Sequence, residues 1–177
     1  AIKHGAVVPF LRPEELSRDD SPEWFAWRHA LRYLEKYEGA MPRTLLSLPT
    51  TSPMRTPKDV EHCLDHFETG NFDVVITVTE AHRNPYFNMV KFNPDDTVRL
   101  VSHPPENINR RQDVPPVFDL TTVAYVMSSK YVIEKEGLFS GRVGAVMIPR
   151  ERSLDIDTLQ DFNFAEYLMN EQLNLKY

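Results

Sequence analysis

Residues 44–78 read TLLSLPTTSPMRTPKDVEHCLDHFETGNFDVVITV, and this stretch decides the fold class. Two short apolar runs, 44–48 and 72–78, have the length and the β-branched content of buried strands. Between them, Thr56 and Asp59 have the spacing of a helical capping box, and a glycine is placed to end the helix. Strand, helix and strand in this order predict a right-handed βαβ unit, and therefore a parallel sheet covered by helices.

The same reasoning predicts a helix before this unit and a change of pattern after it. Ser21 as the N-cap and Pro22 in the first helical position start a helix, which Gly39 closes. From residue 84 to 116, two short alternating stretches are followed by a polar segment rich in Pro, Asn and Arg. This pattern is typical of a hairpin arm that projects from a sheet.

The last third of the chain returns to the α/β pattern. A strand is predicted at 121–127, a short helix at 128–136 and a last strand at 143–148. A final helix begins at Thr158, where Asp161 completes a second capping box. Its apolar positions have helical spacing and predict a buried stripe formed by Leu159, Phe162, Ala165 and Met169.

Composition excludes several classes of protein. The chain has 177 residues, the size of one domain, and its net charge of −6 without a cluster of Lys and Arg argues against a general nucleic-acid-binding protein. No apolar run approaches the ~18 residues of a membrane span. The six glycines form neither a G-x-G-x-x-G nor a Walker-type phosphate loop. Because the single cysteine, Cys63, cannot form an internal disulfide, we expect a cytoplasmic protein.

Asp155 and Asp157 are the sharpest candidates for chemistry. We expect these carboxylates, separated by one residue at the end of a strand, to point to the same side while Ile156 points into the core. Two converging carboxylates suit Mg²⁺, which takes a few carboxylate ligands together with water and substrate phosphates. Spacing alone leaves another interpretation open, in which Asp157 caps the final helix and Asp155 is a solvated neighbour.

Two other clusters are weaker candidates. His62, Cys63 and His66 suggest zinc, but at ~100° per residue the histidines lie away from the apolar stripe that holds Cys63, so the three side chains cannot converge. Arg110 and Arg111 lie in the polar arm, and arginine suits phosphate or carboxylate recognition. A solvated, charged loop is the simpler interpretation of these arginines.

Five segments, in order and with matching spacing from about residue 5 to residue 168, resemble the CMP-sugar synthetases that activate sialic acids and related ulosonic acids. One of them, 48–55, resembles the family's L-x-x-T-S-P-L-R turn, and 153–162 resembles its S-x-D-I-D-T-x-x-D-F signature. The remaining segments are 12–21, 75–85 and 111–125.

The resemblance implies one domain over residues 1–177, with a three-layer, Rossmann-like α/β fold of the nucleotide-diphospho-sugar transferase type. It implies a homodimer joined through the arm at 84–116. It also implies transfer of CMP from CTP to the anomeric hydroxyl of a sialic-acid-like ulosonic acid, with release of pyrophosphate.

The resemblance also assigns roles to residues. Asp155 and Asp157 would hold Mg²⁺ on the phosphates. The nucleotide would meet Arg12 and Ser21, and Arg111 would face the sugar carboxylate across the dimer interface. The residues placed near the sugar are Thr51, Arg111, Gln112, Thr121 and Tyr125.

The chain departs from the family in two respects. The family's opening strand and its A-R-x-x-S-K-type loop are not in this sequence, so we expect residues 1–177 to be an N-terminally incomplete domain that lacks part of the active site. A non-catalytic binding or dimerisation module of the same fold is the alternative. Asp119 and Thr121 stand where the sialic-acid enzymes usually carry arginine and asparagine. Because the carboxylate of Asp119 would repel that of a sugar acid, either Asp119 points elsewhere or the acceptor differs from common sialic acid. We expect a related ulosonic acid as the acceptor.

Overall fold

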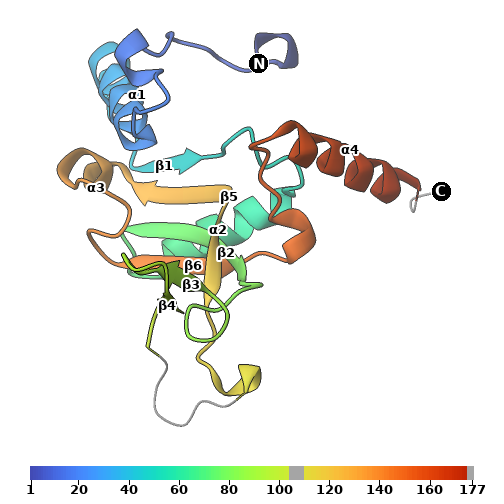
Figure 1. The fold of residues 1–177 in the computed structure, drawn as a ribbon. Helices are drawn as coiled ribbons and strands as arrows, with labels where there is room; N and C mark the ends of the chain where they lie inside the picture. The colour runs from blue at the N-terminus through green and yellow to red at the C-terminus, as the bar shows by residue number, and fades with distance from the viewer. Residues whose placement is uncertain (104–109, 175–177) are drawn as a thin grey trace.

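The computed structural model describes residues 1–103 and 110–174, in which a sheet is covered on both faces and two elements project from it (Figure 1). The sheet has four strands in the order β1-β5-β2-β6. β2 and β6 run parallel, whereas β5 is antiparallel to both β1 and β2. The bounds are Thr44–Ser47 for β1, Val74–Glu80 for β2, Phe118–Ser128 for β5 and Val143–Met147 for β6.

The sheet is mixed, so the predicted parallel sheet is wrong in this respect. β1 and β2, the strands of the predicted βαβ unit, run in the same direction, but β5 lies between them. The chain leaves β2 at Glu80, forms the arm and returns at Phe118, which pairs with Glu80. A strand that returns directly beside its predecessor in this way is antiparallel to it.

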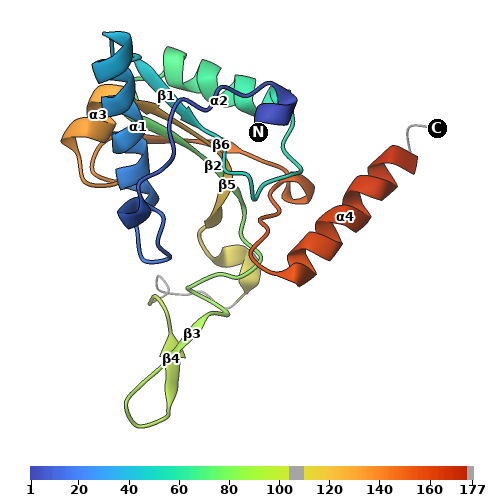
Figure 2. The ribbon, with the colours of Figure 1, turned by 90° about the horizontal axis from the view of Figure 1, so that it is seen from above.

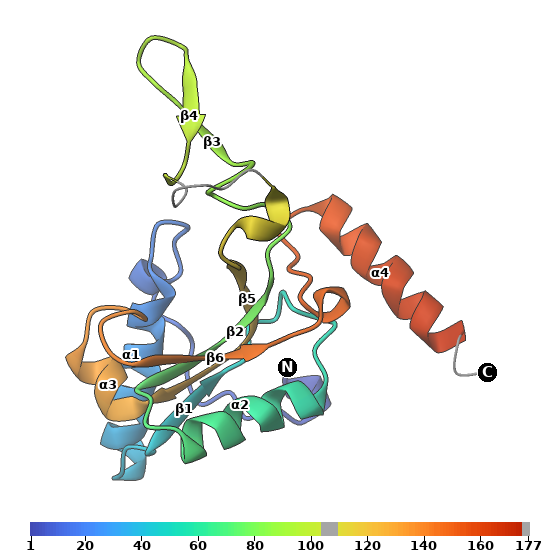
Figure 3. The ribbon, with the colours of Figure 1, turned by 90° about the horizontal axis from the view of Figure 1, so that it is seen from below.

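The three predicted layers are present. Helix α2 (Pro57–Thr69) covers one face of the sheet, while α1 (Glu23–Glu38) and α3 (Ser129–Glu134) cover the other (Figures 2 and 3). Alternate residues of the central strands supply two separate cores. One surrounds Cys63 of α2 and includes Val75 and Val126, and the other surrounds Trp24 of α1 and includes Val74 and Met127. The sheet is therefore buried on both faces.

The start of α1 differs from the prediction. The helix begins at Glu23 with Pro22 in the N-cap position, and no side chain caps it. The Ser21 hydroxyl instead donates to the carbonyl oxygen of Glu15 at 2.6 Å. Ser21 therefore stabilises the loop before the helix. Gly39 follows the last residue with a φ of 77°, a left-handed conformation that glycine adopts easily, so the predicted helix end is confirmed.

The predicted hairpin arm is confirmed. β3 (Val90–Phe92) and β4 (Val98–Leu100) pair antiparallel and project from the body of the molecule (Figure 3). Residues 104–109 of the predicted arm lie outside the described residues. The short 3₁₀ helix η3 (Arg111–Asp113) precedes the return into β5.

Helix α4 (Leu159–Asn174) extends away from the sheet in Figure 1. Its predicted buried stripe is wrong over most of its length, because Ala165 is 3% exposed but Leu159, Phe162 and Met169 are 76%, 51% and 46% exposed. Periodicity identifies an apolar face without identifying what covers it. No helix in the described part of the chain is long and apolar enough to cross a membrane.

Candidate active site

The two candidate aspartates lie in an extended segment, 153–157, that links the 3₁₀ helix η4 (Arg150–Arg152) to α4. They were expected at the end of a strand, but β6 ends at Met147 and η4 intervenes. Asp155 is half-buried and Asp157 is exposed. Because 153–157 is not a strand, the alternation of side chains along a strand does not fix the two carboxylates on the same side.

Thr158 caps α4, so the alternative interpretation of Asp157 as the helix cap is wrong. The Thr158 Oγ1 accepts a hydrogen bond from the Asp161 N–H at 3.3 Å, and Asp161 Oδ2 accepts one from the Thr158 N–H at 2.8 Å. This is the predicted capping box. The Asp157 N–H also donates to Asp161 Oδ2, at 3.3 Å, but the Asp157 carboxylate takes no part in the cap.

One carboxylate oxygen of Asp155, Oδ1, is buried without a hydrogen bond from any of the described residues. Burying a carboxylate oxygen without a partner is unfavourable, so a cation or a donor supplied by a ligand would stabilise this atom. Asp155 Oδ1 can therefore accept a further hydrogen bond or coordinate a cation.

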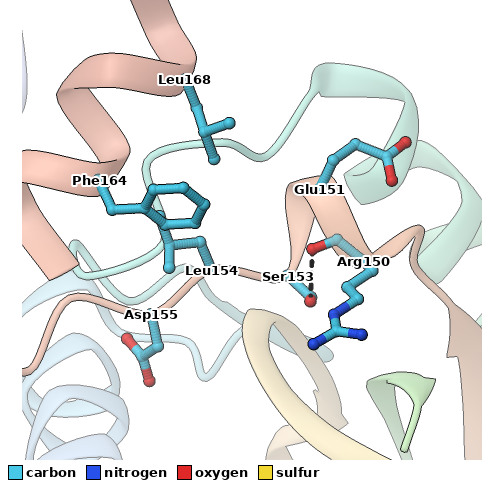
Figure 4. A pocket seen from close by; sticks show the side chains of 7 residues that line it. All are labelled: Arg150, Glu151, Ser153, Leu154, Asp155, Phe164 and Leu168. Carbon is cyan, nitrogen blue, oxygen red and sulfur yellow. Dashed lines mark hydrogen bonds between the residues drawn. The ribbon is translucent and has the colours of Figure 1, made fainter. Parts of the chain in front are cut away.

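A hollow of about 600 Å³ lies beside Asp155 (Figure 4). One wall consists of the apolar side chains of Phe164 and Leu168 from α4, and the other comes from the 150–155 segment, with Arg150 exposed at its edge. The Asp155 carboxylate points away from the two apolar side chains. The hollow thus combines an apolar surface with polar groups on one side, as ligand sites often do.

Thr51 and Tyr125 lie near the aspartates. The Ile156 N–H donates to the carbonyl oxygen of Thr51 at 2.9 Å. Burial raises the pKa of the Tyr125 phenol to about 12, and the carboxylates of Glu23 and Asp155 add to this effect. Tyr125 therefore keeps its proton at neutral pH, and its side chain is close enough to Asp155 for the carboxylate charge to affect its pKa.

Thr121, in contrast, is part of the sheet interior. Its hydroxyl is buried and donates to Thr77 Oγ1 at 2.7 Å, where the register between β2 and β5 shifts. Thr77 Oγ1 also accepts a hydrogen bond from the Ala124 N–H at 3.2 Å. The Thr121 hydroxyl therefore stabilises the sheet at the point where the pairing of β2 and β5 changes register.

The remaining predicted site residues lie outside the hollow beside Asp155. Gln112 is exposed in η3, where it lines a smaller hollow of about 190 Å³ with Glu80 and Arg83. Arg111 belongs to η3, but its side chain lies outside the described residues. Arg12 is exposed in the loop before η2 (Glu14–Leu16), and Ser21 holds that loop. Among the described side chains, no hydrogen bond or ion pair joins Arg12, Ser21 or Gln112 to the 153–157 segment.

The histidine and cysteine cluster of α2 does not form a metal site in the described structure. Cys63 is fully buried, which raises the pKa of its thiol to about 11, with a further contribution from Asp59. The His66 ring instead packs against Phe72, with 4.9 Å between the ring centroids. Within 1–103 and 110–174, no three His, Cys, Asp or Glu side chains come together.

An ion pair between Arg152 and Asp59 beside the candidate site was missed at the level of sequence. Its oxygen and nitrogen atoms are 2.8 Å apart, and Asp59 is almost fully buried. The capping box predicted the position of Asp59, but no local pattern links a residue of α2 to one of η4.

Curated relatives match nearly the whole chain. A post-translational flagellin modification protein B of Campylobacter coli is 28% identical over 97% of this chain and 72% of its own. A CMP-N,N'-diacetyllegionaminic acid synthase of Campylobacter jejuni is 28% identical over 96% of this chain and 71% of its own. An N-acylneuraminate cytidylyltransferase of Streptococcus agalactiae is 23% identical over 98% of this chain but only 41% of its own. The resemblance to the CMP-sugar synthetase family is confirmed.

The fold has a solved counterpart. A CMP:2-keto-3-deoxy-manno-octonic acid synthetase, solved in complex with CTP, matches with a TM-score of 0.57 and 14% identity, over 88% of this chain and 71% of that chain. At this identity the match concerns the fold alone, and it confirms the predicted Rossmann-like nucleotidyltransferase architecture. No family model matches the chain.

Proposed function

We propose that this protein is a cytidylyltransferase that transfers CMP from CTP to the anomeric hydroxyl of a sialic-acid-like ulosonic acid and releases pyrophosphate. The names of the Campylobacter jejuni and Streptococcus agalactiae relatives support this reaction. The observation that carries it is the buried, unpartnered oxygen of Asp155 beside a hollow, with the free carboxylate of Asp157 two residues further on.

Asp155 and Asp157 would hold Mg²⁺. The donor set fits, because carboxylate oxygens are the ligands that Mg²⁺ prefers and Asp155 Oδ1 has no hydrogen-bond donor among the described residues. When bound, the ion would neutralise negative charge on the triphosphate. The chain's own contribution is to fix the ligand-bearing segment, through the hydrogen bond from the Ile156 N–H to Thr51.

The remaining residues are proposed to bind substrates. Tyr125, which keeps its proton at neutral pH, can donate a hydrogen bond to an oxygen of the sugar. Arg12 would bind phosphate oxygens, and Ser21 would shape the loop that carries it. Arg111 and Gln112, at the base of the arm, would reach the sugar of a partner subunit. Thr51 and Thr121 would act through the turn and the strand that they stabilise.

We propose a homodimer formed through the arm at 84–116. Val90 and Phe92 of β3 pair with Leu100 and Val98 of β4, so four apolar side chains share one face of the hairpin. Phe92 is 76% exposed, although an aromatic side chain of this size is normally covered. A second copy of the arm is the partner that supplies matching apolar surface.

The acceptor is proposed to be an ulosonic acid other than common sialic acid. Asp119 is exposed on β5, where a negative charge disfavours the carboxylate of a sugar acid. Equal or better turnover of N-acetylneuraminate than of any related acid in a panel would contradict this assignment.

Pyrophosphate release by the full-length protein tests the reaction. It is measured with each nucleoside triphosphate, with a panel of ulosonic acids, and with or without Mg²⁺. We expect release with CTP, dependent on both the acid and the metal. Asp157→Ala should nearly abolish it, whereas Asp65→Ala, an exposed carboxylate of α2 outside the hollow, should not change it.

Two outcomes would overturn the proposal. A folded protein that releases no pyrophosphate with any nucleotide is a non-catalytic member of the fold. Unchanged release by Asp157→Ala removes Asp157 from the metal site.

A further inference from the structure

Arg152 and Asp59 join two segments that are 93 residues apart in the sequence. Arg152 Nε donates to Asp59 Oδ2 at 2.9 Å, and Nη2 donates to Asp59 Oδ1 at 2.8 Å. This bidentate geometry fixes the guanidinium plane relative to the carboxylate. Asp59 is 2% exposed, so its carboxylate is shielded from water.

Asp59 has two functions in this arrangement. Its Oδ2 also accepts hydrogen bonds from the backbone N–H and the hydroxyl of Thr56, both at 2.8 Å. Four donors therefore hold a single buried carboxylate, which leaves it one orientation. As a result, Arg152 is fastened to the first turn of α2, which packs on the central sheet.

The Arg152 contact is one of two anchors that bracket Asp155. Arg152 lies three residues before Asp155, and Ile156 lies directly after it. The Ile156 N–H donates a hydrogen bond of 2.9 Å to the Thr51 carbonyl oxygen. Both anchors lie in the 51–59 segment. That segment is itself tied to β5, because the hydroxyls of Ser52 and Thr122 are 2.6 Å apart.

This bracketing explains how Asp155 can keep an oxygen buried without a partner. A carboxylate on a free loop would rotate until water reached both oxygens, because the unpartnered state is unfavourable. The state persists only if the backbone on both sides is held in place.

We propose that Arg152 and Asp59 are positioning residues that hold Asp155 in the orientation required for ligand binding. They act through the backbone of 152–156 and do not touch the substrate. The effect on activity rests on the proposed function, whereas the effect on the order of the segment does not. The alternative is that the Arg152–Asp59 ion pair stabilises the fold as a whole and has no specific effect on Asp155.

The experiment compares variants of the full-length protein. Arg152→Lys keeps the charge but loses the bidentate geometry, and Arg152→Met keeps much of the aliphatic stem. Lys130→Met is the matched control, because Lys130 forms an exposed ion pair with Glu134 at 3.9 Å, away from the hollow. Thermal unfolding, amide hydrogen exchange of peptides covering 150–158, and the Mg²⁺ concentration for half-maximal pyrophosphate release are measured for each variant.

For Arg152→Lys and Arg152→Met we expect exchange in 150–158 to increase at least about tenfold, beyond any change elsewhere in the protein. The half-maximal Mg²⁺ concentration should rise by a similar factor. In an Asp155→Asn background, Arg152→Met should add no further loss of activity, because the residue that it positions is already absent.

Other results would overturn the positioning role. One such result is exchange in 150–158 that rises no more than the global change in stability explains. Another is additive effects of Arg152→Met and Asp155→Asn on activity. In either case the Arg152–Asp59 ion pair only stabilises the fold. If the wild-type protein releases no pyrophosphate, the proposed reaction fails, but the exchange measurement still decides whether Arg152 orders the segment.

Discussion

Two carboxylates at the same end of the sheet have opposite environments. Asp59 is buried with four hydrogen-bond donors, while Asp155 has a buried Oδ1 without one among the described residues. A fully satisfied buried charge stabilises local structure, whereas an unsatisfied one is available to a ligand. The contrast agrees with the proposed roles, in which Asp59 positions the segment and Asp155 binds a ligand.

Asp59 should make folding sensitive to acid. Burial alone would raise the pKa of its carboxyl, but hydrogen bonds from Arg152 and Thr56 outweigh burial and lower the pKa below its ordinary value. A lowered pKa means that the stabilisation is present above the unfolded-state value of ~3.9 and is lost as the pH falls through the folded-state value.

Asp59→Asn should therefore lower the free energy of unfolding by about 3 kcal/mol at pH 7, because it leaves Arg152 without its charged partner. The difference from the wild type should shrink as the pH falls below about 4, through the lowered pKa of Asp59. Urea unfolding at several pH values checks both expectations. A difference that is constant across this range would show that Asp59 does not lose its stabilising charge there.

Cys63 should be unreactive in the folded protein. Its thiol is fully buried and has a pKa of about 11, against an ordinary value of ~8.5. At pH 8 the thiolate fraction is then lower by roughly two orders of magnitude, and access is blocked as well. A thiol reagent such as DTNB should label the protein only at the rate of unfolding, and rapid labelling without denaturant would contradict the burial.

At the scale of elements, the sequence predicted where helices and strands lie better than it predicted the direction in which the strands run. The capping boxes of α2 and α4, the hairpin arm and the end of α1 are confirmed, because each rests on contacts within a few residues. The antiparallel direction of β5 could not be predicted, because alternation along a strand is the same in both directions. The Arg152 pair was missed for the related reason that it joins distant segments. The aspartate pair could be proposed from the sequence because its two members are close together in the chain.

The two capped helices should respond differently to the loss of the cap. Thr56→Ala removes a cap from α2, which packs on the core, so the free energy of unfolding should fall by about 1 kcal/mol. Thr158→Ala removes the equivalent cap from α4, most of whose apolar side chains are exposed. Here we expect faster hydrogen exchange in α4 with little change in global stability. Equal losses of global stability would show that α4 is part of the cooperative core.

At the scale of the whole molecule, the arm has two chemically different faces. The apolar face consists of Val90, Phe92, Val98 and Leu100, and the opposite face presents Lys91 directly across from Arg99. Two like charges in opposite positions weaken a hairpin, so the arm is poorly stabilised by its own contacts. An isolated two-stranded hairpin is marginal in water, and burial of its apolar face against a second copy would stabilise it.

Phe92→Glu should therefore dissociate the proposed dimer into monomers. In a two-fold interface each substitution occurs twice, and burial of a Phe side chain is worth about 1.5–3 kcal/mol, so the dissociation constant should rise at least about 100-fold. Lys91→Glu is the control, since it places a glutamate on the opposite face, makes the net charge more negative than Phe92→Glu does, and removes the repulsion with Arg99. Sedimentation equilibrium of the full-length protein measures the constant for each variant. If Lys91→Glu dissociates the dimer as strongly as Phe92→Glu does, net charge and not the apolar face controls association, and if neither does, the interface lies elsewhere on the molecule.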